Sequence, residues 1–186
     1  MRTLPSRINI TAAAVVLLAG LAALAGCSGG SPAVASPVQV VAAADRQPAP
    51  QLRGELLDGS GSYDLAQREG DVVVVNFWGS WCAPCVAEAD DLEQTYLATK
   101  DARVSFLGVN IRDERDKARS FTTGRATYPS VFDPSGSLAL GFSVPPTLIP
   151  TTFIIDRQGR IAVVIRSAVL RADLEALVRQ VAAEGR

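Results

Sequence analysis

Between positions 51 and 186, the apolar residues occur in continuous runs and in runs with a helical period. Two continuous runs rich in β-branched residues, 72–77 and 104–111, are typical of strands buried on both faces of a sheet. The segment 83–99 and the segment that begins at Leu170 repeat apolar residues every three or four positions, which predicts a helix with one buried face in each. The expected buried face of the first helix includes Val86, Ala89, Leu92 or Glu93, Tyr96 and Leu97.

Shorter segments complete an alternation of strands and helices. Segments 152–155 and 161–165 flank a polar turn and predict a β-hairpin. Segment 53–57 predicts a short strand, followed by a turn and then by a second strand or a loop at 62–65. The charged segment 113–119 is expected to begin a helix whose charges face solvent. A βαβ unit followed by a ββα unit indicates the α/β class, with a mixed central sheet and helices on both of its faces.

The first 50 residues have a different composition. Residues 1–26 carry two arginines, then an apolar run and small residues, a pattern typical of a signal peptide for export. The apolar run is short for a membrane span, so an uncleaved anchor is the weaker alternative. Residues 28–50 are rich in Ser, Gly, Pro, Ala and Val without a period, which predicts a disordered tether ahead of a folded domain at 51–186.

The four residues Leu24-Ala25-Gly26-Cys27 resemble the lipobox of bacterial lipoproteins. The resemblance implies that Cys27 is lipidated and becomes the first residue of the mature chain, so that 27–50 holds the domain at the membrane. The alternative is plain secretion with a free thiol at Cys27, although such a thiol is a liability in an oxidising compartment.

Composition and charge remove several classes of function. The chain has no histidine, which excludes a Ser-His-Asp triad, a Cys-His dyad and any zinc, haem or copper site that needs an imidazole. The 18 Lys and Arg residues are scattered and balanced by 19 Asp and Glu residues, giving a net charge of -1. Such a surface argues against a nucleic-acid partner, because binding phosphates requires clustered positive charge.

The chemistry is expected where the first buried strand ends. Cys82 and Cys85 are separated by Ala83-Pro84 at the predicted start of a helix, where proline is tolerated. One helical turn brings the two sulfurs close enough for a reversible disulfide. The helix N-terminus favours a thiolate on Cys82, the expected nucleophile, and Cys85 would then resolve the mixed disulfide. A structural disulfide and half of a zinc site are the alternatives, but a three-residue loop stabilises little and the other zinc ligands are absent.

Two motifs together resemble a known family. The segment from Asn76 to Cys85, and Pro150-Thr151-Thr152-Phe153-Ile154-Ile155-Asp156 further along, are similar to the thioredoxin-like domain of membrane-attached thiol-disulfide oxidoreductases of the ResA and TlpA type. The resemblance covers residues 51–186. It implies a thioredoxin-like fold and a redox-active disulfide, with no further cofactor and no metal.

The resemblance assigns roles to single residues. Pro150 falls at the position of a cis-proline that faces the dithiol, and the backbone of Ile149 would pair with a bound substrate peptide. Asn76 occupies the position where thioredoxin has a buried aspartate, so proton transfer to and from Cys85 would fall to Glu88, which matches the family's active-site glutamate. The alternative for Glu88 is a surface residue in a salt bridge. Trp81 is the candidate for contact with the substrate.

Two positions depart from the family pattern. Asp90 stands where relatives commonly have proline, so we expect no kink there in the first helix. Ala83 follows Cys82 where some relatives have glutamate. Because the dipeptide between the cysteines influences the redox potential, the direction of electron flow is less firmly predicted than the fold.

The resemblance therefore implies a lipid-anchored thiol-disulfide oxidoreductase on the extracytoplasmic face of the cell membrane. It would reduce cysteine-containing exported proteins, apocytochrome c above all, during cytochrome c maturation. A membrane thiol-disulfide transporter would supply its electrons. The alternatives are a general disulfide oxidase or isomerase for exported proteins, a copper or haem carrier, and a peroxidase, whose Pro-x-x-x-Thr-x-x-Cys motif is not matched by Val75 and Gly79.

Overall fold

The computed structural model describes residues 36–184, and a six-stranded sheet runs through them. The strands are β1 (Val38–Val40), β2 (Arg53–Glu55), β3 (Ser62–Asp64), β4 (Val72–Trp78), β5 (Val104–Ile111), β6 (Ser130–Asp133), β7 (Thr151–Ile155) and β8 (Ile161–Ile165). The helices are α1 (Ala83–Thr99), α2 (Arg115–Thr122), α3 (Ser137–Gly141) and α4 (Arg171–Ala183), and short 3₁₀ turns lie at Leu65–Arg68, Lys100–Ala102 and Pro146–Leu148.

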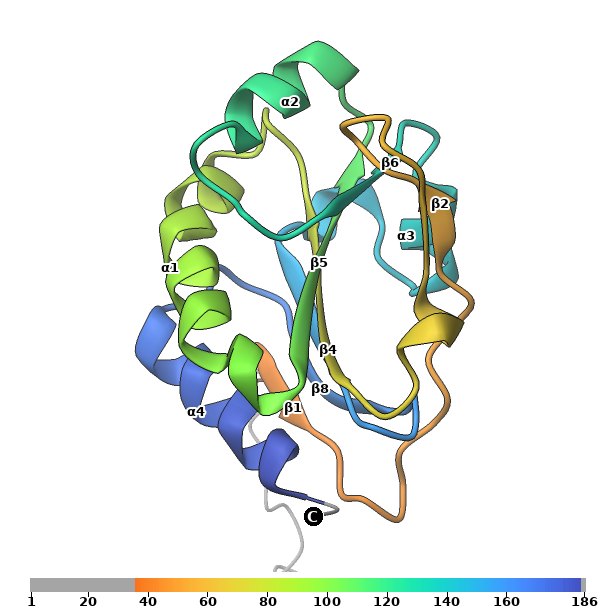
Figure 1. Ribbon diagram of the computed structural model, residues 1–186, viewed down its shortest axis with the longest axis vertical. Coiled ribbons are helices and arrows are strands. Elements are labelled where there is room, and N and C mark those ends of the chain that lie inside the picture. Colours follow the sequence, from red (N-terminus) through yellow and green to blue (C-terminus); the bar gives the residue numbers. More distant parts are fainter. Residues whose placement is uncertain (1–35, 185–186) are drawn as a thin grey trace, which may run out of the picture. The chain divides into compact units, whose positions relative to one another are not determined.

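The sheet has the order β1-β8-β7-β4-β5-β6, with a separate β2–β3 hairpin. In it, β4 runs parallel to β5 and antiparallel to β7, so the sheet is mixed. Helices α1 and α4 cover one face, while α3 and the β2–β3 hairpin lie on the other (Figure 1). This agrees with the expected α/β architecture, and the β7–β8 hairpin is confirmed.

The apolar runs of the central strands serve both faces of the sheet. In β4, Val72 and Val74 belong to the core under α1 and α4, whereas Val73, Val75 and Phe77 belong to the core on the opposite face. Since successive side chains of a strand point to opposite faces, a strand between two cores must be apolar throughout. This is why the two continuous runs in the sequence are the central strands.

The buried face of α1 differs from the expected one. Val86 and Leu97 are exposed, and the inward face consists of Cys85, Glu88, Ala89, Leu92, Thr95 and Thr99. The two threonines can be buried because their hydroxyls donate to backbone carbonyls of the preceding turn of the same helix. The helix runs without interruption past Asp90, as the missing proline predicts.

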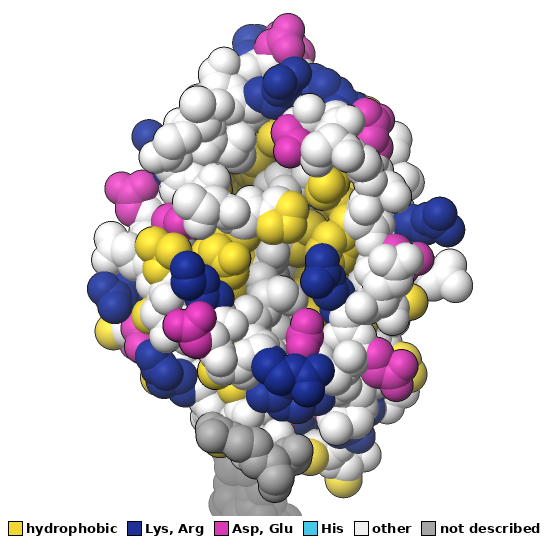
Figure 2. Space-filling model, viewed as in Figure 1, with side chains coloured by type: hydrophobic (Ala, Val, Ile, Leu, Met, Phe, Trp, Pro, Cys, Tyr) yellow, Lys and Arg dark blue, Asp and Glu magenta, His cyan; other side chains and the backbone are white. Residues whose placement is uncertain are grey.

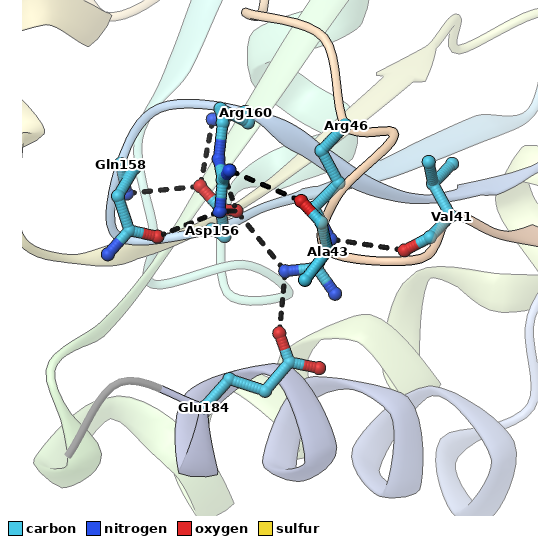
Figure 3. A network of polar contacts seen from close by, with 7 residues as sticks. All are labelled: Val41, Ala43, Arg46, Asp156, Gln158, Arg160 and Glu184. Atoms are coloured by element: carbon cyan, nitrogen blue, oxygen red, sulfur yellow. Dashed lines mark hydrogen bonds and ion pairs between the residues drawn. The ribbon is translucent and has the colours of Figure 1, made fainter.

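The expected disordered tether is wrong for residues 36–50. Strand β1 pairs antiparallel with β8 at the edge of the sheet, and the buried guanidinium of Arg46 lies 3.2 Å from Asp156 Oδ2 (Figure 3). Arg46 also pairs with Glu184, just beyond α4. A strand of three residues is too short to show a period in the sequence, and its stability comes from partners more than 100 residues away. Residues 1–35, including the expected signal peptide and Cys27, lie outside the described residues.

Candidate active site

The two cysteines lie at the junction of β4 and α1. Cys82 is the N-cap residue of α1 and forms a disulfide with Cys85 in its first turn, with 5.2 Å between their Cα atoms. Cys82 Sγ also accepts a hydrogen bond from the backbone N–H of Cys85 at 3.3 Å. Pro84 occupies the first turn, where its missing N–H leaves no hydrogen bond unmade. Cys82 Sγ therefore sits at the positive end of the helix dipole, which favours a thiolate once the disulfide is reduced.

Strand β7 brings the cis-proline segment to the same end of the sheet. The Ile149–Pro150 bond is cis, and Thr151, the next residue, pairs with Phe77 near the end of β4. Ile149 packs against an apolar cluster that includes both cysteines. The register of β7 on β4 and the packing of Ile149 thus place 149–150 beside the disulfide.

An apolar cluster surrounds the disulfide. Its buried members are Leu57, Trp78, Cys82, Cys85 and Ala118, with Phe121, Phe132 and Ile149 packed against them. On the face viewed in Figure 2, apolar side chains gather in the centre, and both basic and acidic side chains lie around them. Trp78 stacks on Phe121, with 5.2 Å between ring centroids.

Trp81 has a different environment from Trp78. It is 52% exposed, and its indole Nε1–H donates to the carbonyl oxygen of Arg112 at 3.0 Å. The N–H is thereby engaged within the protein, and the exposed part of the ring is what a substrate could contact.

Glu88 is buried one helical turn after Cys85. It is 1% exposed; its Oε1 accepts from Asn76 Nδ2 at 2.8 Å and its Oε2 accepts from the backbone N–H of Val169 at 2.9 Å. Asn76 Nδ2 also donates to Thr152 Oγ1 at 3.0 Å. The alternative of a surface salt bridge is wrong, because both carboxylate oxygens accept from neutral donors inside the protein.

Burial gives this carboxyl group an unusual protonation equilibrium. Removal from water raises the pKa of Glu88 from 4.5 to about 7, against the opposing effect of the hydrogen bonds from Val169 and Asn76; the nearby charge of Asp91 adds to the rise. Tyr128, whose own pKa is raised by burial, also lies near Glu88. A carboxyl group that titrates near neutral pH can both take up and release a proton under physiological conditions.

The raised pKa predicts a pH-dependent stability. Between pH 4.5 and about 7, the folded state keeps a proton on Glu88 that the unfolded state has lost, so stability falls as pH rises through this window. The Glu88 contribution amounts to about 3 kcal/mol across the window. Urea unfolding from pH 4.5 to 8 should show wild type losing this free energy relative to Glu88→Gln. Parallel curves for the two proteins would contradict the titration.

Sequence reasoning missed several partners of the site. Val169 donates to Glu88 from the loop after β8, and no local motif marks it. Thr152 accepts from Asn76 and lies within the motif that begins at Pro150, but that motif assigns it no role in the site. Asp113, expected on a solvated face, is half-buried and accepts hydrogen bonds from the backbone N–H and the hydroxyl of Ser80. An aspartate two residues after a buried strand is the only signal that could have marked it.

Neither a metal cluster nor a spanning helix occurs in the described part of the chain. Within residues 36–184, no three His, Cys, Asp or Glu side chains gather as metal ligands would. No helix in the same range has the length and apolar character needed to cross a bilayer.

The sequence matches one family model and is similar to several known proteins. The sequence model described as the AhpC/TSA family matches residues 46–164. The chain belongs to the AhpC/TSA family. This AhpC/TSA family member is 31% identical over 112 residues to the thiol-disulfide oxidoreductase ResA of Geobacillus kaustophilus, an alignment that covers 60% of this chain and 63% of that protein. The match thus spans less than two thirds of the curated relative.

Two solved structures resemble this AhpC/TSA family member over most of their length. A secreted thiol-disulfide isomerase from Corynebacterium glutamicum has a TM-score of 0.77 and 35% identity, and the match covers 83% of this chain and 96% of the other. A thiol:disulfide interchange protein of the thioredoxin family from Chlorobium tepidum has a TM-score of 0.68 and 26% identity, with 76% and 100% covered. The expected thioredoxin-like fold is confirmed.

Proposed function

We propose that the protein is a thiol-disulfide oxidoreductase that reduces disulfides in exported proteins. The observation that carries the proposal is the Cys82–Cys85 pair at the N-terminus of α1, beside a cis-proline and one turn before a buried carboxyl group. The named activities of the relatives support the same reaction class.

The reaction conserves electrons and protons in two exchanges. The Cys82 thiolate attacks one sulfur of the substrate disulfide, forming a mixed disulfide and releasing the other substrate sulfur as a thiolate. Cys85 then loses its proton and attacks Cys82 Sγ, so that the second substrate sulfur leaves and the Cys82–Cys85 disulfide forms. Two electrons pass to the substrate, and its two thiolates become thiols by taking up two protons, which balance the protons that Cys82 and Cys85 release to solvent and to the group that accepts from Cys85.

Glu88 is the group that we assign to the proton of Cys85. It lies one helical turn from Cys85 on the buried face of α1, and its pKa of about 7 is suited to accepting a proton near neutral pH. Asn76, at the position where thioredoxin has an aspartate, donates a hydrogen bond to Glu88 instead of exchanging protons. Trp81, Ile149 and Pro150 would contact the substrate.

The clients and the location remain part of the proposal. We assign the protein to the extracytoplasmic face of the membrane, with Cys27 as its lipid anchor, apocytochrome c among its clients and a membrane thiol-disulfide transporter as its electron donor. The competing function is a general oxidase or isomerase of exported proteins, since one similar structure carries the name of an isomerase.

Measurement of the dithiol potential separates these functions. A reductant should equilibrate with glutathione at a potential well below about -200 mV, because more positive values belong to oxidants and isomerases. Insulin reduction should accompany the low potential. A potential well above that limit, with refolding of scrambled disulfides, would support the isomerase function, and turnover of peroxide would support the peroxidase alternative.

The role of Glu88 predicts a specific pH profile. Deprotonated Glu88 accepts the proton from Cys85, so the rate of mixed-disulfide resolution should rise with pH and level off above about 7. Glu88→Gln should remove this inflection and slow resolution by about a hundredfold or more at neutral pH. Stopped-flow measurement of resolution from pH 5 to 9 tests this.

Asp90→Asn is the matched control for the loss of one charge on α1. Asp90 is exposed on the same helix and lies 3.8 Å from Arg125. Its variant should keep the wild-type profile. An unchanged inflection in Glu88→Gln would assign the proton transfer to another group.

A further inference from the structure

The turn between β5 and α2 holds the chain just before Cys82 at two points. The backbone N–H of Ser80 donates to Asp113 Oδ2 at 2.6 Å, and its hydroxyl donates to Asp113 Oδ1 at 2.9 Å. The indole of Trp81 donates to the carbonyl of Arg112 at 3.0 Å. Ser80 and Trp81 are the two residues directly before the nucleophilic cysteine, so this turn fixes the path by which the chain enters α1.

The Asp113 carboxylate is itself held in place. Asn110 Nδ2 donates to Oδ2 at 2.9 Å, and the backbone N–H of Glu114 donates to Oδ1 at 2.8 Å. Asn110 is fully buried, and its Oδ1 has no hydrogen-bond partner among residues 36–184. A buried amide with an unpaired oxygen destabilises a fold. The same amide donates the hydrogen bond that orients Asp113.

The ionisation of Asp113 follows from the same contacts. Burial acts to raise its pKa, but the hydrogen bonds donated by Asn110, Ser80 and Glu114 outweigh burial and hold the pKa below the usual range of aspartate. At neutral pH, the group is therefore a carboxylate with a full negative charge beside the segment that leads to the dithiol.

Two backbone features serve the contact with Trp81. Arg112 has a φ of 48°, in the left-handed region that residues with a side chain rarely adopt. A Cβ atom on Gly79 would lie 2.7 Å from Trp81 Nε1, so the indole can fold over this position only because it has no side chain. The backbone N–H of Cys82 closes the turn by donating to the carbonyl of Gly79 at 3.1 Å.

We propose that Arg112 and Asp113 are positioning residues for the dithiol, and that the negative charge of Asp113 makes the dithiol a stronger reductant. The proposal rests on the thiol-disulfide exchange proposed above. A thiolate on Cys82 exists only in the reduced protein. The Asp113 carboxylate is hydrogen-bonded to Ser80, two residues before Cys82, and its negative charge disfavours a second negative charge on the Cys82 sulfur. The charge therefore favours the disulfide form, which means that the reduced protein gives up its electrons more readily.

The test is equilibration of the Cys82–Cys85 pair with glutathione. In this equilibrium, one protein disulfide and two glutathione thiols form one protein dithiol and one glutathione disulfide, with two electrons and two protons moving to the protein. Asp113→Asn removes the charge and leaves one acceptor oxygen for four donors. We expect the equilibrium to shift toward the dithiol by about fivefold, which corresponds to about 20 mV. The pKa of the Cys82 thiol, followed by thiolate absorbance, should fall in parallel.

Asp116→Asn is the matched control. Asp116 is an exposed residue in the first turn of α2, and its replacement removes the same charge without removing a bond to Ser80. Its equilibrium constant should stay at the wild-type value. Equal shifts in the two variants, or no shift in Asp113→Asn, would overturn the proposal.

A second variant keeps the proposal testable if Asp113→Asn does not fold. Ser80→Ala removes the hydroxyl that donates to Asp113 and keeps the negative charge of Asp113. Because that charge is then less compensated, the glutathione equilibrium should move about twofold in the opposite direction, toward the disulfide. An unchanged constant in Ser80→Ala would overturn the proposal. Failure of the wild type to reduce insulin would count against the proposed function alone, because the glutathione equilibrium is measured without any protein substrate.

Discussion

Cys82→Ser is expected to lower the rate of insulin reduction to that of the uncatalysed reaction. Cys82 Sγ lies at the N-terminus of α1, where the helix dipole and the N–H of Cys85 favour a thiolate. A serine hydroxyl at the same position stays protonated at neutral pH and cannot form a mixed disulfide. Insulin turbidity, with reductant supplied, measures the loss.

Two further serine variants complete this experiment. Cys85→Ser keeps the nucleophile and removes the resolving thiol, so it should accumulate a mixed disulfide with the client, visible on a non-reducing gel. Cys27→Ser makes the same chemical change at the third cysteine of the chain and should leave reduction of a soluble substrate at the wild-type rate. Substantial activity in Cys82→Ser would place the nucleophile elsewhere and refute the mechanism.

Alanine in place of Arg46 is expected to destabilise the fold by about 2–3 kcal/mol. The side chains of Arg46 and Asp156 are 4% and 3% exposed, so removing the guanidinium leaves a buried carboxylate with one counter-ion fewer. Loss of one partner of a buried pair typically destabilises by about 3–5 kcal/mol. The expected value is smaller because Arg160 still pairs with Asp156 at 2.9 Å and two backbone N–H groups still donate to it.

Urea unfolding at neutral pH measures this loss. Arg53→Ala is the control, since Arg53 is exposed in the β2–β3 hairpin and its loss should change the free energy of unfolding by less than about 0.5 kcal/mol. Arg46→Ala should also loosen the contact of residues 36–48 with the sheet, so hydrogen exchange of the β1 amides should become faster in that variant. Equal stability of the two variants would show that this segment is not docked in solution.

The parts of the fold that could be predicted from the sequence are those whose signal is local. The β-branched runs of β4 and β5, the turn between β7 and β8, and the two cysteines at the start of a helix each occupy a few consecutive residues. The site residues Cys82 and Cys85 were predicted in this way, whereas Glu88 and Pro150 were assigned by resemblance to the family.

The parts that could not be predicted depend on distant partners. Strand β1 has no recognisable pattern of its own, because its three residues are stabilised by β8 and by the ion pairs of Arg46. The inward face of α1 was misjudged because helical periodicity assumes that buried positions are apolar, whereas Glu88 is held inside by Asn76 and Val169. Polar burial of this kind requires donors from β4 and from the loop after β8, and only the fold brings them together.

The placement of the tryptophans makes the molecule its own optical probe. The chain has two tryptophans, Trp78 and Trp81, and both precede the disulfide by a few residues. A disulfide quenches the emission of a neighbouring indole, so reduction should brighten the intrinsic fluorescence, and no indole elsewhere in the chain contributes background. Electron transfer to and from this protein can therefore be followed continuously, without a label, by its intrinsic tryptophan fluorescence.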